Sequence, residues 1–146
     1  MSLGGAKTME NYSVLIGREF MQLHDIKNLL TQTYWASHYS METLENALAH
    51  SLSFGIRDEL TQKQVAFARV ITDYATRFYI VDVIVDAYYR NRGIGNQLIE
   101  TIINYEPLKA LRGLLITKDA NELYRKFGFE EYNITCMQKQ ADLFSL

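Results

Sequence analysis

The sequence predicts a single α/β domain with a mixed, mostly antiparallel central sheet and helices packed against it. Three observations predict this fold class. Residues 52–58 and 64–73 read as two strands joined by the polar connection 59–63, which is typical of an antiparallel hairpin. From residue 77 onward the pattern becomes strand, helix, strand, helix, strand. The 146 residues suffice for one domain with a sizeable core and are too few for two ordinary domains.

The first half of the chain supplies one strand and two helices before the hairpin. Residues 12–16 alternate weakly and suit a first strand. Residues 24–33 predict a helix with an apolar face at helical spacing, formed by Ile26, Leu29, Leu30 and Tyr34. Ser40 is placed to cap a second helix. The apolar stripe of that helix consists of Met41, Leu44 and Leu48.

The second half begins with a turn at residues 73–76, which leads into a strand over residues 77–85. A third helix, residues 96–105, is expected to pack through Ile94, Leu98, Ile99 and Ile102. Residues 113–117 predict a short buried strand. A fourth helix, residues 119–127, gathers Ala120, Leu123, Tyr124 and Phe127 on one face, with Gly128 at its C-terminal end. Residues 129–137 predict a last strand.

Bulk properties exclude several classes of protein. The formal net charge is −2 and no block of five basic residues occurs, which argues against a general nucleic-acid-binding protein. Asp82 interrupts the longest apolar run, so we expect no membrane span. Cys136 is the only cysteine and cannot form an internal disulfide, and no secretory signal is visible, so we expect a cytoplasmic protein. Residues 1–8 read as a cloning remnant or a disordered start, which leaves residues 9–146 as the domain.

The most informative stretch is residues 90–95, Arg-Asn-Arg-Gly-Ile-Gly, between the strand and the third helix. Gly93 and Gly95 let the backbone approach a ligand closely. The first N–H groups of a helix lack internal partners, and the helix dipole favours an anion there. Arg90 and Arg92 add two permanent cations. The pattern indicates a phosphate-binding loop; the alternative is an ordinary turn with two solvated arginines.

Two common nucleotide motifs do not fit. The third glycine of the dinucleotide fingerprint is missing, because residues 96–98 are Asn-Gln-Leu, and no Walker-type sequence occurs. The loop instead resembles the acyl-coenzyme A signature of the GNAT superfamily of N-acetyltransferases, Q/R-x-x-G-x-G/A, as Arg90-x-x-Gly93-x-Gly95. Residues 121–129, Asn-Glu-Leu-Tyr-Arg-Lys-Phe-Gly-Phe, resemble the second signature of the superfamily. The similarity covers roughly residues 64–135.

The resemblance implies a GNAT-type sheet and direct acetyl transfer from acetyl-coenzyme A to an amine, without a metal. It implies that the loop N–H groups hold the pyrophosphate and that the preceding strand binds the pantetheine arm through its backbone. The implied coenzyme-binding residues are Val83, Val85, Arg90, Asn91, Arg92, Gly93, Ile94, Gly95, Asn96 and Asn121. Asn91 stands where many family members have glycine, and asparagine tolerates the left-handed region better than most residues.

Two residues are candidates for the chemistry. The resemblance puts Tyr124 close to the thioester sulfur, where a phenol with a pKa of about 10 can donate a proton to the leaving thiolate. Its helical spacing alone favours a core residue. Asp82 is an acid within an apolar strand and is the candidate base, or a binding group for a cationic acceptor. Its alternative is a structural ion pair with Arg69 or Arg77. Asp86 lies nearer the loop and is expected to be solvated.

The acceptor side is less defined. Trp35, with Tyr34 and Tyr39, can form an aromatic wall for a cation or an apolar acceptor, or can simply hold the helix connection on the core. His38 lies in the same segment and is a third candidate base, although a loop histidine is more often a surface residue. Cys136 is expected to be a buried small residue rather than a nucleophile.

We therefore predict an acetyl-coenzyme A-dependent N-acetyltransferase acting on a small-molecule amine, with a peptide amine as the lesser alternative. A second hypothesis is an acyl-coenzyme A sensor without turnover. An acetyltransferase that modifies RNA is a third, and the acidic balance argues against it. The resemblance also implies that homodimers are common, with the last strand and residues 138–146 as candidate contact elements.

Overall fold

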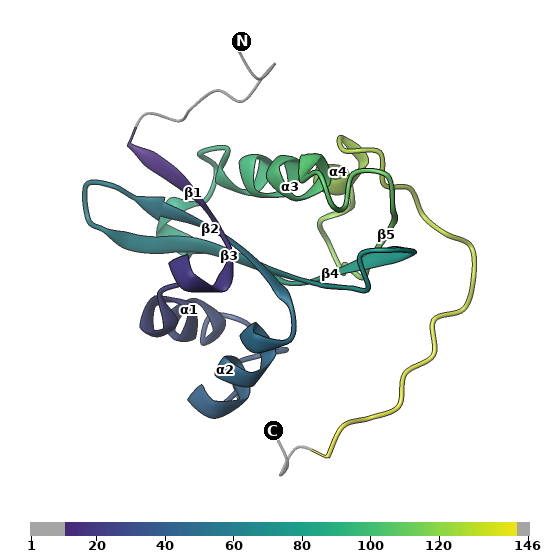
Figure 1. Ribbon diagram of the computed structural model, residues 1–146, viewed down its shortest axis with the longest axis horizontal. Coiled ribbons are helices and arrows are strands. Elements are labelled where there is room, and N and C mark those ends of the chain that lie inside the picture. Colours follow the sequence, from purple (N-terminus) through teal and green to yellow (C-terminus); the bar gives the residue numbers. More distant parts are fainter. Residues whose placement is uncertain (1–10, 143–146) are drawn as a thin grey trace.

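The computed structural model describes residues 11–142 and contains a five-stranded sheet in the order β1-β2-β3-β4-β5 (Figure 1). Neighbouring strands are antiparallel from β1 to β4, and β4 and β5 are parallel. The strands are β1 (Tyr12–Ile16), β2 (Leu52–Asp58), β3 (Lys63–Thr72), β4 (Arg77–Val85) and β5 (Arg112–Leu115). The predicted class, an α/β domain with a mixed and mostly antiparallel sheet, is confirmed. The expectation for residues 1–8 lies outside the described residues.

Helices cover both faces of the sheet. Figure 1 shows α1 and α2 on one side of it and α3 and α4 on the other. The helices are α1 (Leu23–Leu30), α2 (Met41–Ala49), α3 (Ile94–Asn104) and α4 (Asn121–Arg125), with short 3₁₀ turns η1 (Arg18–Phe20) and η2 (Ala87–Tyr89). As predicted, Ser40 caps α2, because its Oγ accepts a hydrogen bond from Thr43 N at 3.0 Å. No helix within residues 11–142 is long and apolar enough to span a membrane.

Two apolar cores result from the alternation of strand side chains. Phe67 and Ile84 point to the face that α1 and α2 cover, where they join Ile26 and Leu30. The other face packs on α3 through the four residues predicted for it, Ile94, Leu98, Ile99 and Ile102. Burial of these side chains contributes roughly 1.5–3 kcal/mol each. The sheet is therefore buried on both faces through its central strands.

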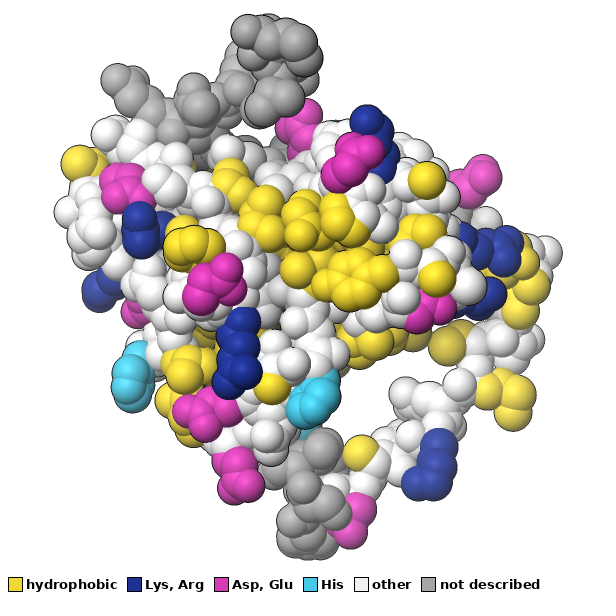
Figure 2. Space-filling model, in the orientation of Figure 1, with side chains coloured by type: hydrophobic (Ala, Val, Ile, Leu, Met, Phe, Trp, Pro, Cys, Tyr) yellow, Lys and Arg dark blue, Asp and Glu magenta, His cyan; other side chains and the backbone are white. Residues whose placement is uncertain are grey.

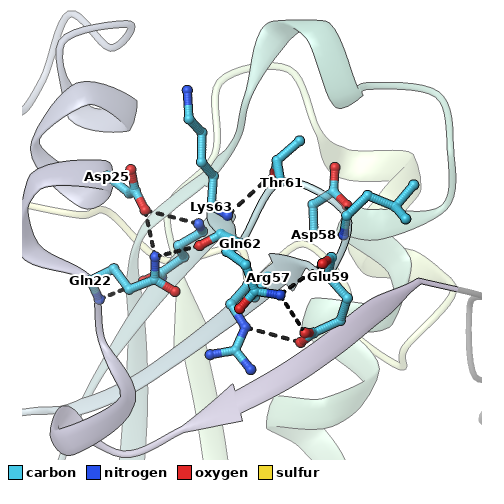
Figure 3. A network of polar contacts seen from close by, with 10 residues as sticks. Gln22, Asp25, Arg57, Asp58, Glu59, Thr61, Gln62 and Lys63 are labelled. Atoms are coloured by element: carbon cyan, nitrogen blue, oxygen red, sulfur yellow. Dashed lines mark hydrogen bonds and ion pairs between the residues drawn. The ribbon is translucent and has the colours of Figure 1, made fainter.

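The β2–β3 hairpin was predicted from its polar connection and is confirmed. A polar network supports the turn and ties it to the start of α1 (Figure 3). Asp25 Oδ2 accepts hydrogen bonds from Gln22 Nε2 at 2.7 Å and from Gln64 N at 3.0 Å. Arg57 Nε donates to Glu59 Oε1 at 2.9 Å within the turn region. These bonds hold the β2–β3 turn in place and tie it to the start of α1.

One irregularity of the sheet was not predicted. Phe67 pairs with Ile84 and Arg69 pairs with Val81, so β4 carries one extra residue in this interval. This is a β-bulge, and Asp82 within it has a φ of 55°. The bulge bends β4 just beyond Ile80, the last residue of β4 that pairs with β5.

The C-terminal part differs most from the sequence expectations. The strand predicted at residues 113–117 is β5, but it is half-exposed rather than buried, because it lies at the edge of the sheet. Helix α4 is shorter than predicted, although Gly128 ends its turn at a φ of 88° as expected. The strand predicted at residues 129–137 is wrong for this structure: the segment forms no strand, and Cys136, expected to be buried, is exposed.

A smaller correction concerns Tyr34. The predicted helical face included it, but α1 ends at Leu30 and Tyr34 lies beyond the last turn, where it is exposed. The preceding Thr33 is buried, and its Oγ1 donates to Leu30 O at 2.8 Å, which closes the end of the helix. The α1–α2 connection, which contains Tyr34, borders the cleft described below.

Candidate functional site

A cleft opens where β4 and β5 separate. Their pairing joins residues 77–80 to residues 112–115 and then stops. Beyond that point, residues 81–85 of β4 line one wall of the cleft and residues 116–120 line the other. Residues of the α1–α2 connection and of the loop before α3 complete its lining. The parallel pair and the bulge in β4 thus create the site by splaying two neighbouring strands.

The loop before α3 has the backbone conformation that an anion site needs. Gly93 is the residue before the helix and has a φ of 80°, in the left-handed region that glycine tolerates best. Asn91 is also in the left-handed region, with a φ of 62°, although it carries a side chain where glycine is common in the family. No side chain caps α3, so its leading N–H groups lack intrahelical partners. Gly93, Ile94, Gly95 and Asn96 all line the cleft.

The two arginines of the loop take different positions. Arg90 lines the cleft, and its Nε donates to Val85 O at 3.3 Å. Arg92 is not part of the lining; its guanidinium lies 5.0 and 5.1 Å from the ring centroids of Tyr88 and Tyr89. A hydrogen bond with Tyr12 raises the pKa of Arg92 above its ordinary value. Of the two predicted cations, the structure brings only Arg90 into the cleft.

The loop is anchored at both ends of η2, to the sheet at one end and to the residues just after α1 at the other. Tyr89 donates its hydroxyl proton to Asp58 Oδ2 at 2.7 Å, which lowers the pKa of Asp58 and raises that of Tyr89. Gln32, at the end of the first helical segment, bonds Asp86 Oδ2 at 3.2 Å and accepts from Ala87 N at 3.1 Å. Asp86, expected to be merely solvated, is therefore a structural residue of the loop.

Tyr124 is a core residue, as its helical spacing alone favours, and it also borders the cleft. The side chain is only 7% exposed and belongs to the core cluster beneath α3, with Phe129 edge-on at 6.0 Å between ring centroids. The same residue lines the cleft. Burial raises the pKa of its phenol, so the hydroxyl is protonated well beyond neutral pH.

Asp82 is in the ion pair that the sequence left as an alternative. The residue is 8% exposed, and Arg69 Nε donates to its Oδ2 at 2.9 Å. Of the two partners considered, Arg69 rather than Arg77 is the one in contact. Asp82 and Arg69 nevertheless both line the cleft. The pKa of Tyr39 is raised by burial and then by the negative charge of Asp82.

Aromatic side chains of the α1–α2 connection also line the cleft. Tyr34, Trp35 and Tyr39 all line it, and the rings of Tyr34 and Trp35 meet edge-on at 5.0 Å. Lys118 comes from the other wall, with its Nζ 5.4 Å from the centroid of Tyr34. His38 is not in the lining and lies edge-on to Tyr39. The structure therefore brings Trp35 to the site and leaves His38 beside it.

Some residues of the site had no signal in the sequence. Tyr79, Lys118 and Gln138 line the cleft, although no motif contains them. They are brought there by the parallel β4–β5 pairing and the course of the chain after α4. Asn121, predicted from the second signature, is outside the lining and donates to Glu131 Oε1 at 3.2 Å. Within residues 11–142, no cluster of His, Cys, Asp or Glu is arranged to hold a metal ion.

The sequence matches a family model described as an acetyltransferase (GNAT) domain over residues 49–131, which include the whole loop, both cleft walls and α4. The chain belongs to the GNAT acetyltransferase family. The matched region is more than half of the chain and contains both signatures identified from the sequence. The mixed sheet with its splayed β4–β5 pair is accordingly a GNAT fold.

Comparison with individual proteins agrees with this family assignment. The structure superposes with a TM-score of 0.81 on a Xanthomonas campestris pv. campestris protein assigned to the GNAT family, at 34% identity over 89% of this chain and 93% of that one. AAC(6')-Iy in complex with the bisubstrate analogue CoA-S-monomethyl-acetylneamine shares the fold, with a TM-score of 0.63 and 21% identity over 89% of this chain and 99% of that one.

A curated relative from Glycine max, named histone acetyltransferase TAP1, is 32% identical over 88 residues, which are 58% of this chain. The aligned region is only 38% of the length of TAP1, so the chain spans well under half of this relative. The likeness therefore concerns the acetyltransferase domain.

Proposed function

We propose that this protein transfers an acetyl group from acetyl-coenzyme A to the amine of a small molecule. The observation that carries the proposal is that one cleft is lined by an uncapped helix start with Arg90 and also by Tyr124 and Asp82. The first feature suits the pyrophosphate of the coenzyme, and the second supplies groups for proton transfer. Family membership supports acetyl transfer as the reaction.

The coenzyme fits the residues at the loop end of the cleft, residues 89–96. The N–H groups at the start of α3 are free to bind phosphate oxygens, and Arg90 can pair two of them with its planar guanidinium. To bind them, Arg90 would exchange its long bond to Val85 O for charge-assisted bonds. On the side of β5, β4 has no strand partner beyond Ile80 among the described residues, so its backbone near Val83 and Val85 can pair with the pantetheine amides.

The reaction needs one bond made, one bond broken and two proton movements. The neutral amine nitrogen attacks the thioester carbonyl carbon, and the carbon–sulfur bond breaks as the amide forms. The leaving thiolate takes the hydroxyl proton of Tyr124, which is protonated because burial raises its pKa. The acceptor nitrogen loses its proton to the other wall, and water then carries a proton from that wall to the phenolate, so that both groups are restored.

Asp82 is the proposed recipient on that wall. Arg69 holds one oxygen of its carboxylate, which orients the group in the cleft. A carboxylate so fixed can bind the acceptor ammonium and accept its proton through a water molecule. Tyr39 borders the same place and completes a polar pocket for the amine.

The acceptor is proposed to be small because aromatic side chains and a lysine from separate segments of the chain meet in the cleft lining. Tyr34, Trp35 and Lys118 come together there from both walls. A peptide amine remains the lesser candidate, and the histone acetyltransferase name of the Glycine max relative is the observation in its favour. We further propose a cytoplasmic location and a homodimer.

Calorimetric titration with acetyl-coenzyme A, coenzyme A and NADH tests the coenzyme site. We expect micromolar affinity for both coenzymes and no heat with NADH, because the loop lacks the third glycine of a dinucleotide site. If neither coenzyme binds, the loop is only a turn and the proposed function fails. Thiol release, followed over a panel of small amines and peptides, then identifies the acceptor class.

An acyl-coenzyme A sensor is the second candidate, and the Asp82–Arg69 pair is the observation that favours it. A carboxylate committed to a buried guanidinium can be purely structural. Coenzyme binding without thiol release for any amine in the panel would support the sensor. Acetylated product from any amine would exclude it.

A further inference from the structure

The ion pair of Arg69 and Asp82 uses only part of each charged group. Arg69 Nε donates to Asp82 Oδ2 at 2.9 Å, and the two side chains are only 12% and 5% exposed. Within residues 11–142, the two Nη groups of Arg69 and Oδ1 of Asp82 form no hydrogen bond. A buried ion pair normally needs further hydrogen bonds on its remaining charged atoms, because an unsatisfied buried charge is costly. Part of each charged group is therefore left for another partner.

The unused atoms of the pair are accessible from the cleft. Arg69 and Asp82 both line it. Neither the Nη groups nor Oδ1 is among the fully buried polar atoms that lack a partner in the described part of the chain. These atoms therefore keep accessible surface. They present a positive and a negative charge side by side in the cleft lining.

The pair lies on the face of the sheet that α1 and α2 cover. Along β3, Phe67 and Arg69 are two residues apart and therefore point to the same side. Phe67 belongs to the core beneath those helices, and Tyr39 packs against the same core. Arg69 pairs with Val81 of β4, so Tyr79, two residues before Val81, also points to this side. Two phenols of the cleft lining thus share a face of the sheet with the pair.

Both phenols can donate hydrogen bonds to an anion. Burial raises the pKa of Tyr39 and of Tyr79, and the negative charge of Asp82 contributes to both increases. The two hydroxyls are therefore protonated at neutral pH. Neither hydroxyl forms a hydrogen bond to another of residues 11–142, so their protons are available beside the free end of Arg69.

The outer surface gives no strong preference for a purely cationic acceptor. Figure 2 shows Lys and Arg side chains interspersed with Asp and Glu over the face that it draws. The formal net charge of the chain is only −2. A mixed surface of this kind produces no large field of one sign that would attract a cation over a distance. Discrimination between acceptors then depends on the charges inside the cleft.

We propose that the acceptor is a free amino acid, whose ammonium group binds Oδ1 of Asp82 and whose carboxylate binds the Nη groups of Arg69. The proposal rests on the proposed function, because it names the acceptor of that reaction. The products are then an N-acetyl amino acid and coenzyme A. The phenols of Tyr39 and Tyr79 add hydrogen bonds to the carboxylate.

The contact within the ion pair explains why the two charges of the acceptor must be close together. Arg69 and Asp82 touch, so a ligand that reaches the free end of each needs its ammonium and its anion only a short distance apart. In an amino acid a single carbon separates them. Each charge of the ligand then meets the opposite charge of the pair. A simple amine satisfies only Asp82 and leaves the guanidinium end without a partner.

Matched acceptors test the proposal on the unmodified protein. Thiol release is measured with a panel of amino acids that covers apolar, aromatic, acidic and basic side chains, because the ion pair recognises only the part that they share. The best amino acid is then compared with its amide and with its decarboxylated amine. We expect its kcat/KM to exceed both by about tenfold or more, as charge-assisted hydrogen bonds give.

Reactivity alone would favour the amide. The amine next to an amide group titrates at about pH 8, so more of it is neutral at pH 7 than in the free amino acid. Equal or better use of the amide or of the decarboxylated amine would overturn the proposal. Acetylation of O-phosphoethanolamine but of no amino acid in the panel would also overturn it, because the anion would then be a phosphate.

Calorimetry separates this proposal from the proposed function. Protein saturated with coenzyme A, which carries no acetyl group, is titrated with the amino acid and with its amide, so that binding is measured without turnover. We expect the amino acid to bind at least about tenfold more tightly. Failure of coenzyme A itself to bind would count against the proposed function. Normal coenzyme binding without a preference for the amino acid would overturn only the present proposal.

Arg69→Lys identifies the residue that recognises the carboxylate. Lysine keeps the positive charge beside Asp82 but lacks the planar fork that pairs with an anion. We expect the preference for the amino acid over its amide to fall at least about tenfold, with coenzyme affinity unchanged. The matched control is Arg77→Lys, because Arg77 is exposed on β4 and outside the cleft lining, and its preference should stay within about twofold. Equal losses for the acid and the amide in Arg69→Lys would show that Arg69 has only a structural role.

Discussion

The loop end of the cleft and the C-terminal edge of the sheet differ in how completely one chain builds them. The loop is fixed by its own backbone, by Tyr89 on Asp58 and by Gln32 on Asp86 and Ala87. The edge has a four-residue strand, a one-turn helix and a following exposed segment that forms neither helix nor strand. A binding loop defined by local conformation is self-contained, whereas an acceptor site assembled from distant segments depends on what covers it.

The largest expected effect concerns the buried ion pair between the two regions. Asp82→Ala leaves the guanidinium of Arg69 without its partner, and we expect a loss of about 3–5 kcal/mol in the free energy of unfolding. Urea unfolding measures it. Glu122→Ala breaks an exposed pair with Arg125 instead, whose side chains are 85% and 48% exposed, and should cost less than about 1 kcal/mol.

The double substitution Arg69→Met with Asp82→Asn separates structure from chemistry. It removes both charges, so we expect most of the lost stability to return. If its turnover also returned, Asp82 would be structural and the proposed base would be wrong. If Asp82→Ala cost no stability, the ion pair would have no structural role.

Tyr124→Phe is the next largest change, because it removes only the hydroxyl from the cleft wall. We expect kcat to fall about 100-fold, the usual contribution of a general acid, with coenzyme affinity unchanged. Because burial raises the pKa of Tyr124, no alkaline loss of activity due to this group should occur below about pH 10. Stopped assays of thiol release across pH provide both measurements.

Tyr105→Phe is the matched control, since Tyr105 packs edge-on to Phe54 in the same core and is outside the cleft lining. Its turnover should stay within about twofold of the parent, because no transition-state contact is lost. Equal losses in the two variants would mean that Tyr124 acts through packing, and Tyr124 would no longer be the proton donor.

Arg90→Glu tests the loop end directly. Reversing the charge of the only loop arginine in the cleft lining should weaken coenzyme binding roughly 30-fold, in the range of charge-assisted bonds. Arg92→Glu reverses a charge that lies on the rings of Tyr88 and Tyr89, and we expect an effect below about fivefold, since such surface charges are screened. Calorimetry compares the two variants. Equal losses of coenzyme affinity in the two variants would show that Arg92 also takes part in coenzyme binding.

The contrast between structure set by local conformation and structure assembled from distant segments also explains what the sequence could predict. The loop was predicted residue by residue because glycines, arginines and a helix start are local signals, and Gly93 has the conformation expected. The Ser40 cap and the packing face of α3 are equally local. Asp82 was recognised as a polar residue in an apolar strand, and Arg69 was one of two partners that neighbouring strands allowed.

What the sequence missed depends on non-local geometry. The bulge at Asp82 is an offset between two strands, which no single strand's pattern contains. Lys118 meets Tyr34 only because β4 and β5 are parallel neighbours. Residues 129–137 have a strand-like pattern but form no strand, because a strand also needs pairing with a distant segment, which the local pattern does not contain.

A smaller effect is expected at the anchor of the loop. Tyr89→Phe removes the hydrogen bond to Asp58, and we expect coenzyme affinity to fall about threefold, as one modest hydrogen bond would give. The bond lowers the pKa of Asp58, so its stabilisation is present above the ordinary carboxyl pKa and is lost as pH falls. The parent should therefore lose more stability than Tyr89→Phe between pH 5 and 3. Identical acid profiles would contradict the anchor.

The smallest expected effects distinguish the two glycines of the loop. Gly93 has a φ of 80°, so Gly93→Ala strains the backbone and should destabilise the fold by about 1 kcal/mol. Gly95 is helical, and a Cβ there would meet Val85 Cγ2 at 3.8 Å and Leu123 Cδ2 at 3.9 Å, which are ordinary contacts. Gly95→Ala should therefore stabilise the fold by up to about 0.5–1 kcal/mol through helix propensity.

Coenzyme affinity of the two variants shows whether each glycine also matters for binding. The signature allows alanine at the second position, so we expect Gly95→Ala to bind the coenzyme within about threefold of the parent, a difference too small to indicate a lost contact. Gly93→Ala should weaken binding more, because it disturbs the N–H groups at the start of α3. Urea unfolding and calorimetry on both variants measure the two effects. A tenfold loss in Gly95→Ala would mean that the coenzyme approaches the backbone at Gly95 more closely than any protein atom does, and the glycine would then be required by the ligand rather than by the fold.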